Sequence, residues 1–228
     1  MDPPPAIELR GLVRHFGERI VLREVSVQVP AGATLAVLGR NGAGKSTLLR
    51  ILATLLRPHA GEVTVLGERL PARAWAVRGR IGLLAHEPLL YRDLSGRENL
   101  GYHARLHGVP PARVEQVLDA VGMRERADES VRQLSRGMVQ RLAVGRTVLH
   151  CPSVLLLDEP LANLDPAATG LVAPLIGRDS GLTRVITSHD PRAALAEADL
   201  VLGLAGGRAA FVSAPDQVDP AAVERLYA

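Results

Sequence analysis

The chain has 228 residues, an apolar fraction of 47% and an aromatic fraction of only 3%. That length can bury a full core and is most simply one domain over residues 1–228, while an aliphatic interior is typical of an α/β protein with buried parallel strands. The formal charge of +3 is small and the basic residues are spread along the chain, so nucleic-acid binding is not expected. No stretch approaches about 18 uncharged apolar residues and the start does not resemble a signal peptide, so we expect the chain to stay in the cytosol.

Lysine and cysteine are each used only once in the chain. Of the 27 basic residues, 26 are arginine and the only lysine is Lys45. Because a compact ammonium and a planar guanidinium are not interchangeable, we expect Lys45 to have a chemical role. Cys151 is the only cysteine. It excludes a disulfide within the chain and, followed by Pro152, is predicted to be a small buried residue without a redox or catalytic role.

The first part of the chain is predicted to form antiparallel strands, one short apolar strand and one helix. Apolar and polar residues alternate over residues 7–29 around two turn signals, as they do in antiparallel strands. A glycine-rich segment then separates an apolar strand from a helical repeat of leucine and isoleucine. The predicted elements are antiparallel strands over 7–29, a strand over 33–38, a helix that ends at Leu56, and a second antiparallel piece over 62–66 and 80–84.

The middle of the chain, residues 85–150, is predicted to be a helical insertion. Ser95-Gly96-Arg97-Glu98 forms a capping box that opens one helix, and Pro110-Pro111 and Leu134-Ser135 open two more. Strand-like runs then return, separated by helical patterns, as in βαβ units; they cover 154–157, 184–187 and 200–204. We therefore expect a core with an antiparallel β subdomain over 1–84 and 151–228, and a helical subdomain over 85–150.

The segment from Gly39 to Ser46 fits the pattern G-x-x-x-x-G-K-S. It lies between a predicted strand and a predicted helix, which is the context that this phosphate-binding loop requires. Its backbone N–H groups would point at anionic oxygens, supported by the positive end of the following helix. Lys45 is expected to reach the β- and γ-phosphates of a nucleotide and the Ser46 hydroxyl to ligate Mg²⁺. The expected nucleotide-binding residues of this loop are Gly39, Arg40, Asn41, Gly42, Ala43, Gly44, Lys45, Ser46 and Thr47.

Two carboxylates, Asp158 and Glu159, directly follow an apolar strand. A buried strand places its terminal side chains at the carboxyl edge of the sheet, where the phosphate loop also opens. Asp158 is expected to hold Mg²⁺ through water, and Glu159 to orient and deprotonate the attacking water. An acidic pair after a strand can instead be a helix cap, an alternative that the phosphate loop upstream disfavours.

A series of further motifs resembles the ABC ATPase family. Leu134-Ser135-Arg136-Gly137-Met138 resembles the LSGGQ signature of that family. Asn163-Leu164-Asp165 is similar to its D-loop, Ser188-His189-Asp190 is similar to its switch histidine, and Phe16 stands at the place of its adenine-stacking aromatic residue. The resemblance runs over residues 7–207. It implies an α/β fold with a RecA-like P-loop NTPase core, an antiparallel β subdomain and an inserted helical subdomain.

The sequence leaves alternatives open for two of these residues. Phe16 precedes Gly17 in the expected turn and would stack on adenine, or else fill the core. His189 would contact the γ-phosphate, or else be a structural histidine at a strand end. With Lys45 and Glu159, His189 completes the catalytic set that the resemblance implies.

The sequence departs from the family after the strand that ends at Leu84. The family usually has a glutamine there, which joins Mg²⁺ to the membrane-facing helical part, and this chain has His86 followed by Glu87. Either the histidine substitutes as a polar contact, or one of these two residues takes the role in part. The departure concerns coupling to a partner more than hydrolysis.

Within the family, the chain most closely resembles the ATP-binding subunit of the cytochrome c maturation system, the haem exporter ATPase. The likeness is carried by Ala85-His86-Glu87-Pro88-Leu89-Leu90-Tyr91, by Asp93-Leu94 and Glu98-Asn99-Leu100, and by the Ser135-Arg136-Gly137-Met138 form of the signature. ATPases of drug, lipid and polysaccharide exporters share much of this pattern and are the alternatives.

The resemblance also implies how the chain works. In the family the phosphate loop and the signature meet across a head-to-tail dimer, so each ATP would be held by Lys45 of one copy and by Ser135 and Gly137 of the other. ATP with Mg²⁺ would close the pair and hydrolysis would open it, moving an integral membrane permease at the cytoplasmic face of the cell membrane. Two other functions are the alternatives. A soluble ABC ATPase of DNA repair or translation is disfavoured by a single compact chain, and a regulatory module without turnover is disfavoured by Glu159 and His189.

Overall fold

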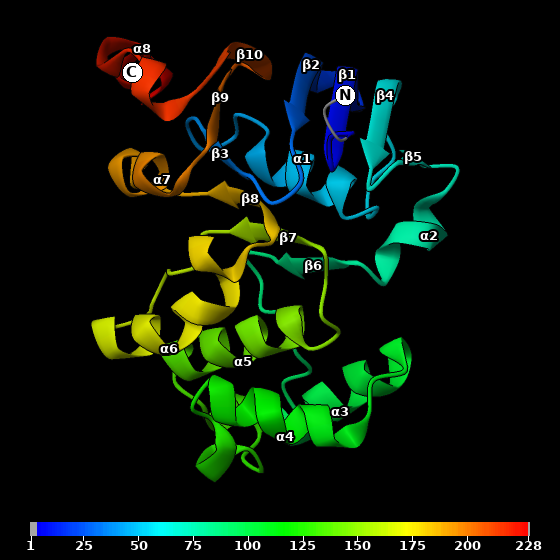
Figure 1. Cartoon of the computed structure of the whole chain (residues 1–228), viewed down its shortest axis with the longest axis vertical. Helices are drawn as coiled ribbons and strands as arrows, with labels where there is room; N and C mark the ends of the chain where they lie inside the picture. Colours follow the sequence, from blue (N-terminus) through cyan, green and yellow to red (C-terminus); the bar gives the residue numbers. More distant parts are fainter. Residues whose placement is uncertain (1–3, 228) are drawn as a thin grey trace.

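The computed structural model describes residues 4–227, and its elements form two sheets with helices around and below them (Figure 1). The first residues of the proline-rich start, 1–3, lie outside this range. One sheet is antiparallel, with the strand order β2-β1-β4-β5. It is built on a hairpin in which Phe16 pairs with Arg19. Its strands are β1 (Ile7–Phe16), β2 (Arg19–Val29), β4 (Ala60–Val65) and β5 (Glu68–Leu70).

The other sheet has the strand order β10-β9-β3-β8-β7-β6, and all its strand pairs are parallel except β10 with β9. Every residue of β3, β7 and β8 is buried. Burial on both faces explains why β3 and β7 show apolar runs without alternation. The strands are β3 (Thr34–Leu38), β6 (Ile81–Leu84), β7 (Val154–Asp158), β8 (Thr183–Thr187), β9 (Leu200–Ala205) and β10 (Arg208–Ser213).

Helices cover both faces of the parallel sheet. Along β3, Leu35 and Val37 join a core cluster with α1 and the antiparallel sheet, whereas Ala36 and Leu38 join one with α5, α6, α7 and α8. This alternation follows from the period of two in a strand. The helices are α1 (Lys45–Leu52), α2 (Ala74–Arg78), α3 (Gly96–His107), α4 (Pro111–Ala120), α5 (Arg136–Val148), α6 (Pro166–Ile176), α7 (Pro191–Glu197) and α8 (Pro220–Tyr227), with short 3-10 turns at Arg124–Arg126, Val131–Gln133, Arg178–Ser180 and Pro215–Gln217.

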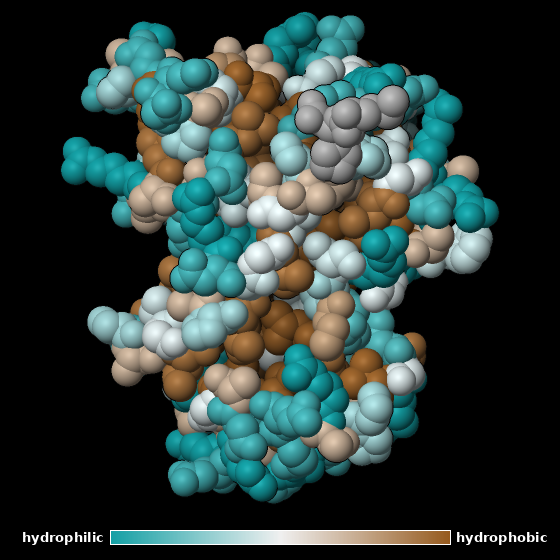
Figure 2. All heavy atoms as spheres, in the orientation of Figure 1, coloured by the Kyte–Doolittle hydropathy of each residue, from teal (hydrophilic) through white to brown (hydrophobic). Residues whose placement is uncertain are grey.

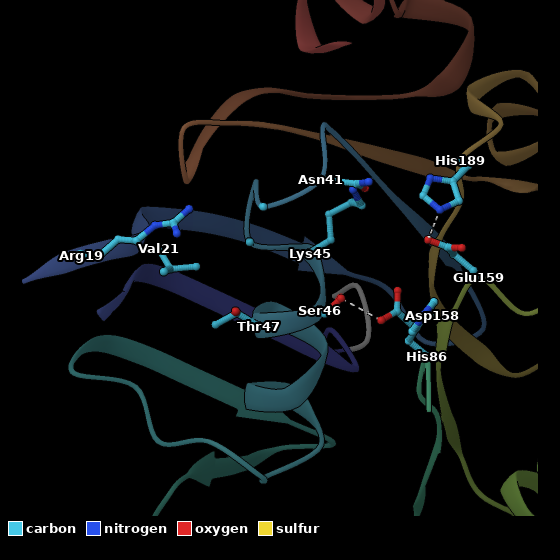
Figure 3. Close-up of a pocket in the computed structure, with 12 residues that line it drawn as sticks. Arg19, Val21, Asn41, Lys45, Ser46, Thr47, His86, Asp158, Glu159 and His189 are labelled. Atoms are coloured by element: carbon cyan, nitrogen blue, oxygen red, sulfur yellow. Dashed lines mark hydrogen bonds and ion pairs between the residues drawn. The ribbon is translucent and has the colours of Figure 1, made fainter. Parts of the chain in front are cut away.

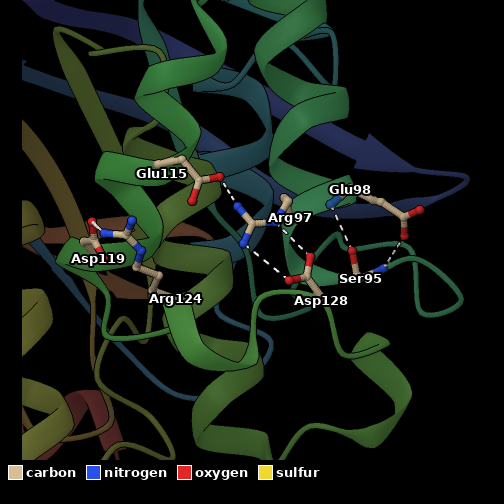
Figure 4. Close-up of polar contacts among 7 residues, drawn as sticks. All are labelled: Ser95, Arg97, Glu98, Glu115, Asp119, Arg124 and Asp128. Atoms are coloured by element: carbon tan, nitrogen blue, oxygen red, sulfur yellow. Dashed lines mark hydrogen bonds and ion pairs between the residues drawn. The ribbon is translucent and has the colours of Figure 1, made fainter.

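Helices α3, α4 and α5 lie at one end of the molecule and share a hydrophobic cluster of their own. The capping box at the start of α3 is formed, because Ser95 Oγ accepts from the Glu98 N–H at 3.1 Å and Glu98 Oε2 accepts from the Ser95 N–H at 2.7 Å. Arg97 binds Asp128 and Glu115 beside it (Figure 4). These contacts fix the entry of α3 against the loop before α5.

The surface differs between the two ends. In Figure 2 the end that α3 and α4 occupy is mostly hydrophilic, whereas apolar residues show at the waist between these helices and the sheets. Among the helices of residues 4–227, none combines the length and the apolar character that crossing a membrane needs.

The structure corrects three expectations. Residues 80–84 do not belong to the antiparallel piece: β6 pairs in parallel with β7, with Ile81 opposite Val154, at the edge of the core sheet. The partner of a strand depends on long-range packing. The local pattern of residues 80–84 therefore predicted a strand but placed it in the wrong sheet. The helix after the phosphate loop ends at Leu52 instead of Leu56, because Thr54 takes a left-handed conformation with φ 62°. The sequence patterns also missed β5, α2, β10 and α8.

Cys151 is the third correction. It is exposed, not buried, since it lies in the turn between α5 and β7 with φ 52°. The neighbouring Leu149 is fully buried instead. The turn therefore points the leucine inward and leaves the thiol at the surface.

Candidate functional site

The phosphate loop joins the carboxyl end of β3 to the amino end of α1, as its motif predicts. Gly39, Gly42 and Gly44 have φ values of 144°, 82° and 111°, a region that side chains rarely enter. Space excludes a side chain as well: a Cβ on Gly39 would stand 2.4 Å from the Leu204 carbonyl oxygen, and one on Gly44 would stand 2.9 Å from that of Val21. These glycines let the loop pass between β9 and β2.

Lys45 is the first residue of α1 and is buried. Its ammonium donates to the carbonyl oxygens of Gly39, at 2.5 Å, and Arg40, at 3.0 Å. Burial lowers the pKa of Lys45, while the carboxylates of Asp158 and Glu159 oppose this shift. The loop's own carbonyls thus hold the cation inside the curve of the phosphate loop.

Asp158 connects α1 to the ends of two parallel strands. Its Oδ2 accepts from Ser46 Oγ at 2.8 Å, and its Oδ1 accepts from Thr187 Oγ1 at 2.5 Å. Asp158 and Thr187 are the paired last residues of β7 and β8. A buried carboxylate needs such partners, and the two hydroxyls hold it in place at the edge of the sheet.

Glu159 and His189 face each other across the same edge (Figure 3). His189 Nε2 lies 2.6 Å from Glu159 Oε1. Glu159 has φ 54°, and its N–H donates to Thr187 Oγ1 at 3.2 Å. Left-handed backbone at a residue other than glycine is strained and collects at functional sites. Here it turns the Glu159 carboxylate toward the phosphate loop.

These side chains line one pocket of about 450 Å³. Figure 3 shows Glu159 and His189 at one end, Arg19 and Val21 at the other, and Lys45 and Ser46 between them. Of the loop residues expected to bind a nucleotide, Gly39, Arg40 and Ala43 are not among the lining residues. The pocket is lined by Arg19, Val21, Asn41, Gly42, Gly44, Lys45, Ser46, Thr47, His86, Asp158, Glu159 and His189.

Phe16 lies outside this lining. It is the last residue of β1, 46% exposed, so it does not fill the core. The guanidinium of Arg14 covers its ring at 4.5 Å from the centroid. Phe16 pairs across the hairpin with Arg19, which does line the pocket.

The signature residues also stand apart from the nucleotide pocket. Ser135 caps α5, its Oγ accepting from the Met138 N–H at 3.3 Å. Arg136 and Leu134 line a neighbouring groove of about 610 Å³, to which His86 also contributes. Asp165 caps α6 instead, its Oδ1 accepting from the Ala168 N–H at 2.7 Å. His86 therefore lies between the pocket and the groove that holds the signature.

Sequence reasoning missed two residues that line the pocket, Arg19 and Val21, and one that supports it from behind, Thr187. Thr187 ended a predicted strand, and its place beside Asp158 in neighbouring parallel strands was the available signal. Arg19 and Val21 begin β2, directly after the hairpin turn, and no local pattern marks them as site residues.

The oxygen donors of this site fit a magnesium ion that is shared with a nucleotide. Ser46 and Asp158 offer a hydroxyl and a carboxylate side by side, and Mg²⁺ prefers one or two such ligands completed by phosphates and water. Within residues 4–227, no cluster of three or more His, Cys, Asp or Glu side chains could hold a metal ion without such help.

Comparison with known proteins agrees with this geometry. The family model described as ABC transporter matches residues 22–162. A phosphonate import ATP-binding protein of Anaeromyxobacter dehalogenans (strain 2CP-C) is 38% identical over 92% of this chain and 45% of its own. A Nod factor export ATP-binding protein of Sinorhizobium fredii (strain NBRC 101917 / NGR234) is 39% identical over 73% of this chain and 50% of its own. The chain thus spans about half the length of these curated relatives.

Among solved structures, one described as the ATP binding subunit of an ABC transporter superposes with a TM-score of 0.84. It is 26% identical and covers 92% of this chain and 90% of its own. The mixed sheets, the phosphate loop and the inserted helices define the ATP-binding fold of that class of transport protein. This chain belongs to the ABC transporter family.

Proposed function

We propose that this chain binds and hydrolyses ATP as the motor subunit of an ABC transporter. The observation that carries the proposal is the convergence, in one pocket, of Lys45, the Ser46–Asp158 pair and the Glu159–His189 pair. Each is a group that phosphoryl transfer to water needs: a cation, oxygen ligands for a metal, and a base with an orienting partner.

Each of these residues would have its own role in binding or hydrolysing ATP. Lys45 and the loop amides would bind the β- and γ-phosphates, and Ser46 and Asp158 would hold Mg²⁺, Asp158 through water. The ion would neutralise charge on the phosphates. Glu159 would orient the attacking water and accept its proton, and His189 would hold the Glu159 carboxylate and contact the γ-phosphate. Phe16, which pairs with the lining residue Arg19, would stack on adenine.

A second copy of the chain is part of the proposal. Ser135 and Gly137 stand at the start of α5, a phosphate-binding device, but do not line this chain's own pocket. A head-to-tail pair would bring them to the ATP of the partner copy, with Asp165 near the contact. ATP would then close the pair and hydrolysis would release it.

An integral membrane permease at the cytoplasmic face of the membrane would receive this movement. We propose His86 as the coupling residue, because it lines both the nucleotide pocket and the signature groove. A polar side chain at that place can respond to nucleotide on one side and to the helical part on the other.

For the cargo, we propose haem export in cytochrome c maturation, supported by the 85–91 segment and the form of the signature. The relatives include both an import protein and an export protein, at 38% and 39% identity, so similarity alone does not identify the cargo. Deleting the gene in its host should abolish covalent haem attachment, read by haem staining of c-type cytochromes, and the wild-type gene should restore it. Undiminished staining would reject this cargo and leave the ATPase proposal standing.

The ATPase proposal is tested with purified protein. Wild type should release phosphate from ATP in a Mg²⁺-dependent reaction. Lys45→Arg should lower the turnover by about 100-fold, because it keeps the charge but places a larger, planar guanidinium in a closely fitted loop. The control is Arg57→Lys, an exposed cation outside the pocket, with unchanged turnover. Absence of hydrolysis in the wild type, with or without liposome-reconstituted permease, would refute the proposal.

A further inference from the structure

Arg19 is a cation in the nucleotide pocket that no motif assigns. It begins β2 and lines the pocket with Val21. In the part of the chain that the structure describes, its side chain makes no hydrogen bond or ion pair with another residue. Arg14, on the paired strand, has its guanidinium over the Phe16 ring instead. Arg19 is therefore the arginine of this hairpin that faces the pocket without a protein partner.

The Arg19 guanidinium reaches over the phosphate loop. Its Nη2 lies 3.8 Å from the position that a Cβ of Gly42 would take. Because Gly42 has no side chain, that guanidinium nitrogen lies above backbone whose amides face the phosphate position. The cation thus reaches the phosphate loop from β2 of the antiparallel sheet.

The order of groups along the pocket says which part of a nucleotide would lie beside Arg19. Glu159 and His189 mark the end where the γ-phosphate would be attacked, and Lys45 and Ser46 lie between that end and Arg19 (Figure 3). The chain of phosphates then leads from Glu159 past Lys45 toward Arg19. Guanidinium is well matched to phosphate oxygens, since its planar fork donates two parallel hydrogen bonds.

We propose that Arg19 is a nucleotide-binding residue whose guanidinium contacts the α- and β-phosphates from the side of the antiparallel sheet. The inference rests on the proposed function, because it requires ATP in this pocket. It gives the phosphates a second side-chain cation besides Lys45. It also ties the β1–β2 hairpin to the phosphate loop whenever nucleotide is bound.

The test is calorimetric titration of MgATP into wild type, Arg19→Gln, Arg19→Lys and Arg23→Gln, at low and moderate salt. Arg23 lies on the same strand, is exposed and does not line the pocket, so it is a matched control. Arg19→Gln should weaken affinity about tenfold, because a charge-assisted hydrogen bond is lost, and should reduce the salt dependence of binding. Arg19→Lys keeps the charge but loses the paired donors, so it should weaken affinity less than Arg19→Gln and keep the salt dependence of wild type. Arg23→Gln should be unchanged.

Each other outcome overturns the inference in a different way. Wild-type affinity in Arg19→Gln would reject it while leaving ATP binding by the chain intact. Equal weakening in Arg19→Gln and Arg19→Lys, with unchanged salt dependence, would show a contact that does not depend on charge, and so not one to phosphates. If wild type itself binds no ATP, the proposed function fails and Arg19's role fails with it. Arg19 is exposed, and equal thermal midpoints for all four proteins would show that folding is unaffected.

Discussion

At the scale of the residue, the geometry of Glu159 separates it from its neighbour Asp158. Asp158 is held by two hydroxyls at the ends of its carboxylate, whereas Glu159 meets only an exposed histidine. The first arrangement suits a fixed ligand and the second suits a group that handles a proton. The carboxylate that stays accessible is the better candidate for the base.

Glu159→Gln should therefore keep ATP binding and lose hydrolysis, since an amide fits the same space but accepts no proton from water. With cleavage blocked, an ATP-bound dimer should accumulate, visible as a doubled mass by light scattering with ATP and Mg²⁺. Asp158→Asn is the contrasting variant, expected to weaken Mg²⁺-dependent binding. A Glu159→Gln protein that stays monomeric under these conditions would count against both the base and the head-to-tail pair.

A second residue-scale prediction concerns His86, whose side chain is exposed between two pockets. His86→Ala should leave ATP affinity nearly unchanged but weaken the stimulation of turnover by the membrane partner. His86→Gln should retain the stimulation, because an amide can accept or donate as the imidazole does. Full stimulation in the alanine variant would make Glu87 the next candidate.

At the scale of the element, β8 carries an arginine in the middle of the core sheet. Arg184 is 1% exposed. It donates to Thr34 Oγ1 at 3.1 Å, to the Ile176 carbonyl at 2.8 Å and to Glu197 Oε2 at 2.9 Å. One side chain thereby fastens β3, the end of α6 and α7 to β8, the strand that also carries Thr187.

Arg184→Ala should lower the free energy of unfolding by about 3 kcal/mol. The substitution removes the buried cation and leaves its three hydrogen-bond acceptors without their donor. The matched control is Arg178→Ala, which breaks an exposed pair with Asp199 and should cost less than about 1 kcal/mol. Urea unfolding followed by circular dichroism measures both. Equal midpoints for the two variants would show that the buried arginine does not hold these elements together.

At the scale of the whole molecule, a histidine cluster lies where the helical end meets the core sheet. His107 and His150 stack with ring centroids 4.1 Å apart, and His150 Nε2 bonds the Ile81 carbonyl of β6 at 3.0 Å. The neighbouring Arg146 donates to the Leu83 carbonyl at 2.6 Å. Burial, together with the positive charge of Arg146, lowers the pKa of His103 to about 4.

The sign of this shift makes the protein less stable in acid. Below about pH 6.5 the unfolded chain binds a proton that folded His103 refuses until about pH 4, so stability falls as pH falls through that window. Between pH 7 and pH 5 the loss from His103 should be about 1–2 kcal/mol in urea unfolding. His103→Leu should flatten the dependence, since its Nε2 is buried without a partner, whereas His15→Gln, on the antiparallel sheet, should not. An unchanged slope in His103→Leu would refute this origin.

The sequence by itself determined what depends on neighbours along the chain. The phosphate loop, the carboxylates at the end of β7 and the helix starts at Ser95 and Ser135 each lie within a few consecutive residues, so the sequence alone predicts them. The roles of Phe16, His86, Asp165 and His189 remain predictions from the resemblance. The sequence shows where these four residues stand relative to the motifs, but not which groups their side chains contact.

Only the tertiary structure decided what depends on segments far apart. Ser46 meets Asp158 across 112 positions, and the Gly39 N–H donates to Tyr227 of α8 across 188 positions at 3.3 Å. The pairing of β6 with β7 and the position of Arg19 in the pocket also depend on segments that are far apart in the sequence. Strand pairing and side-chain burial are set by packing over the whole chain, so no local pattern could supply them.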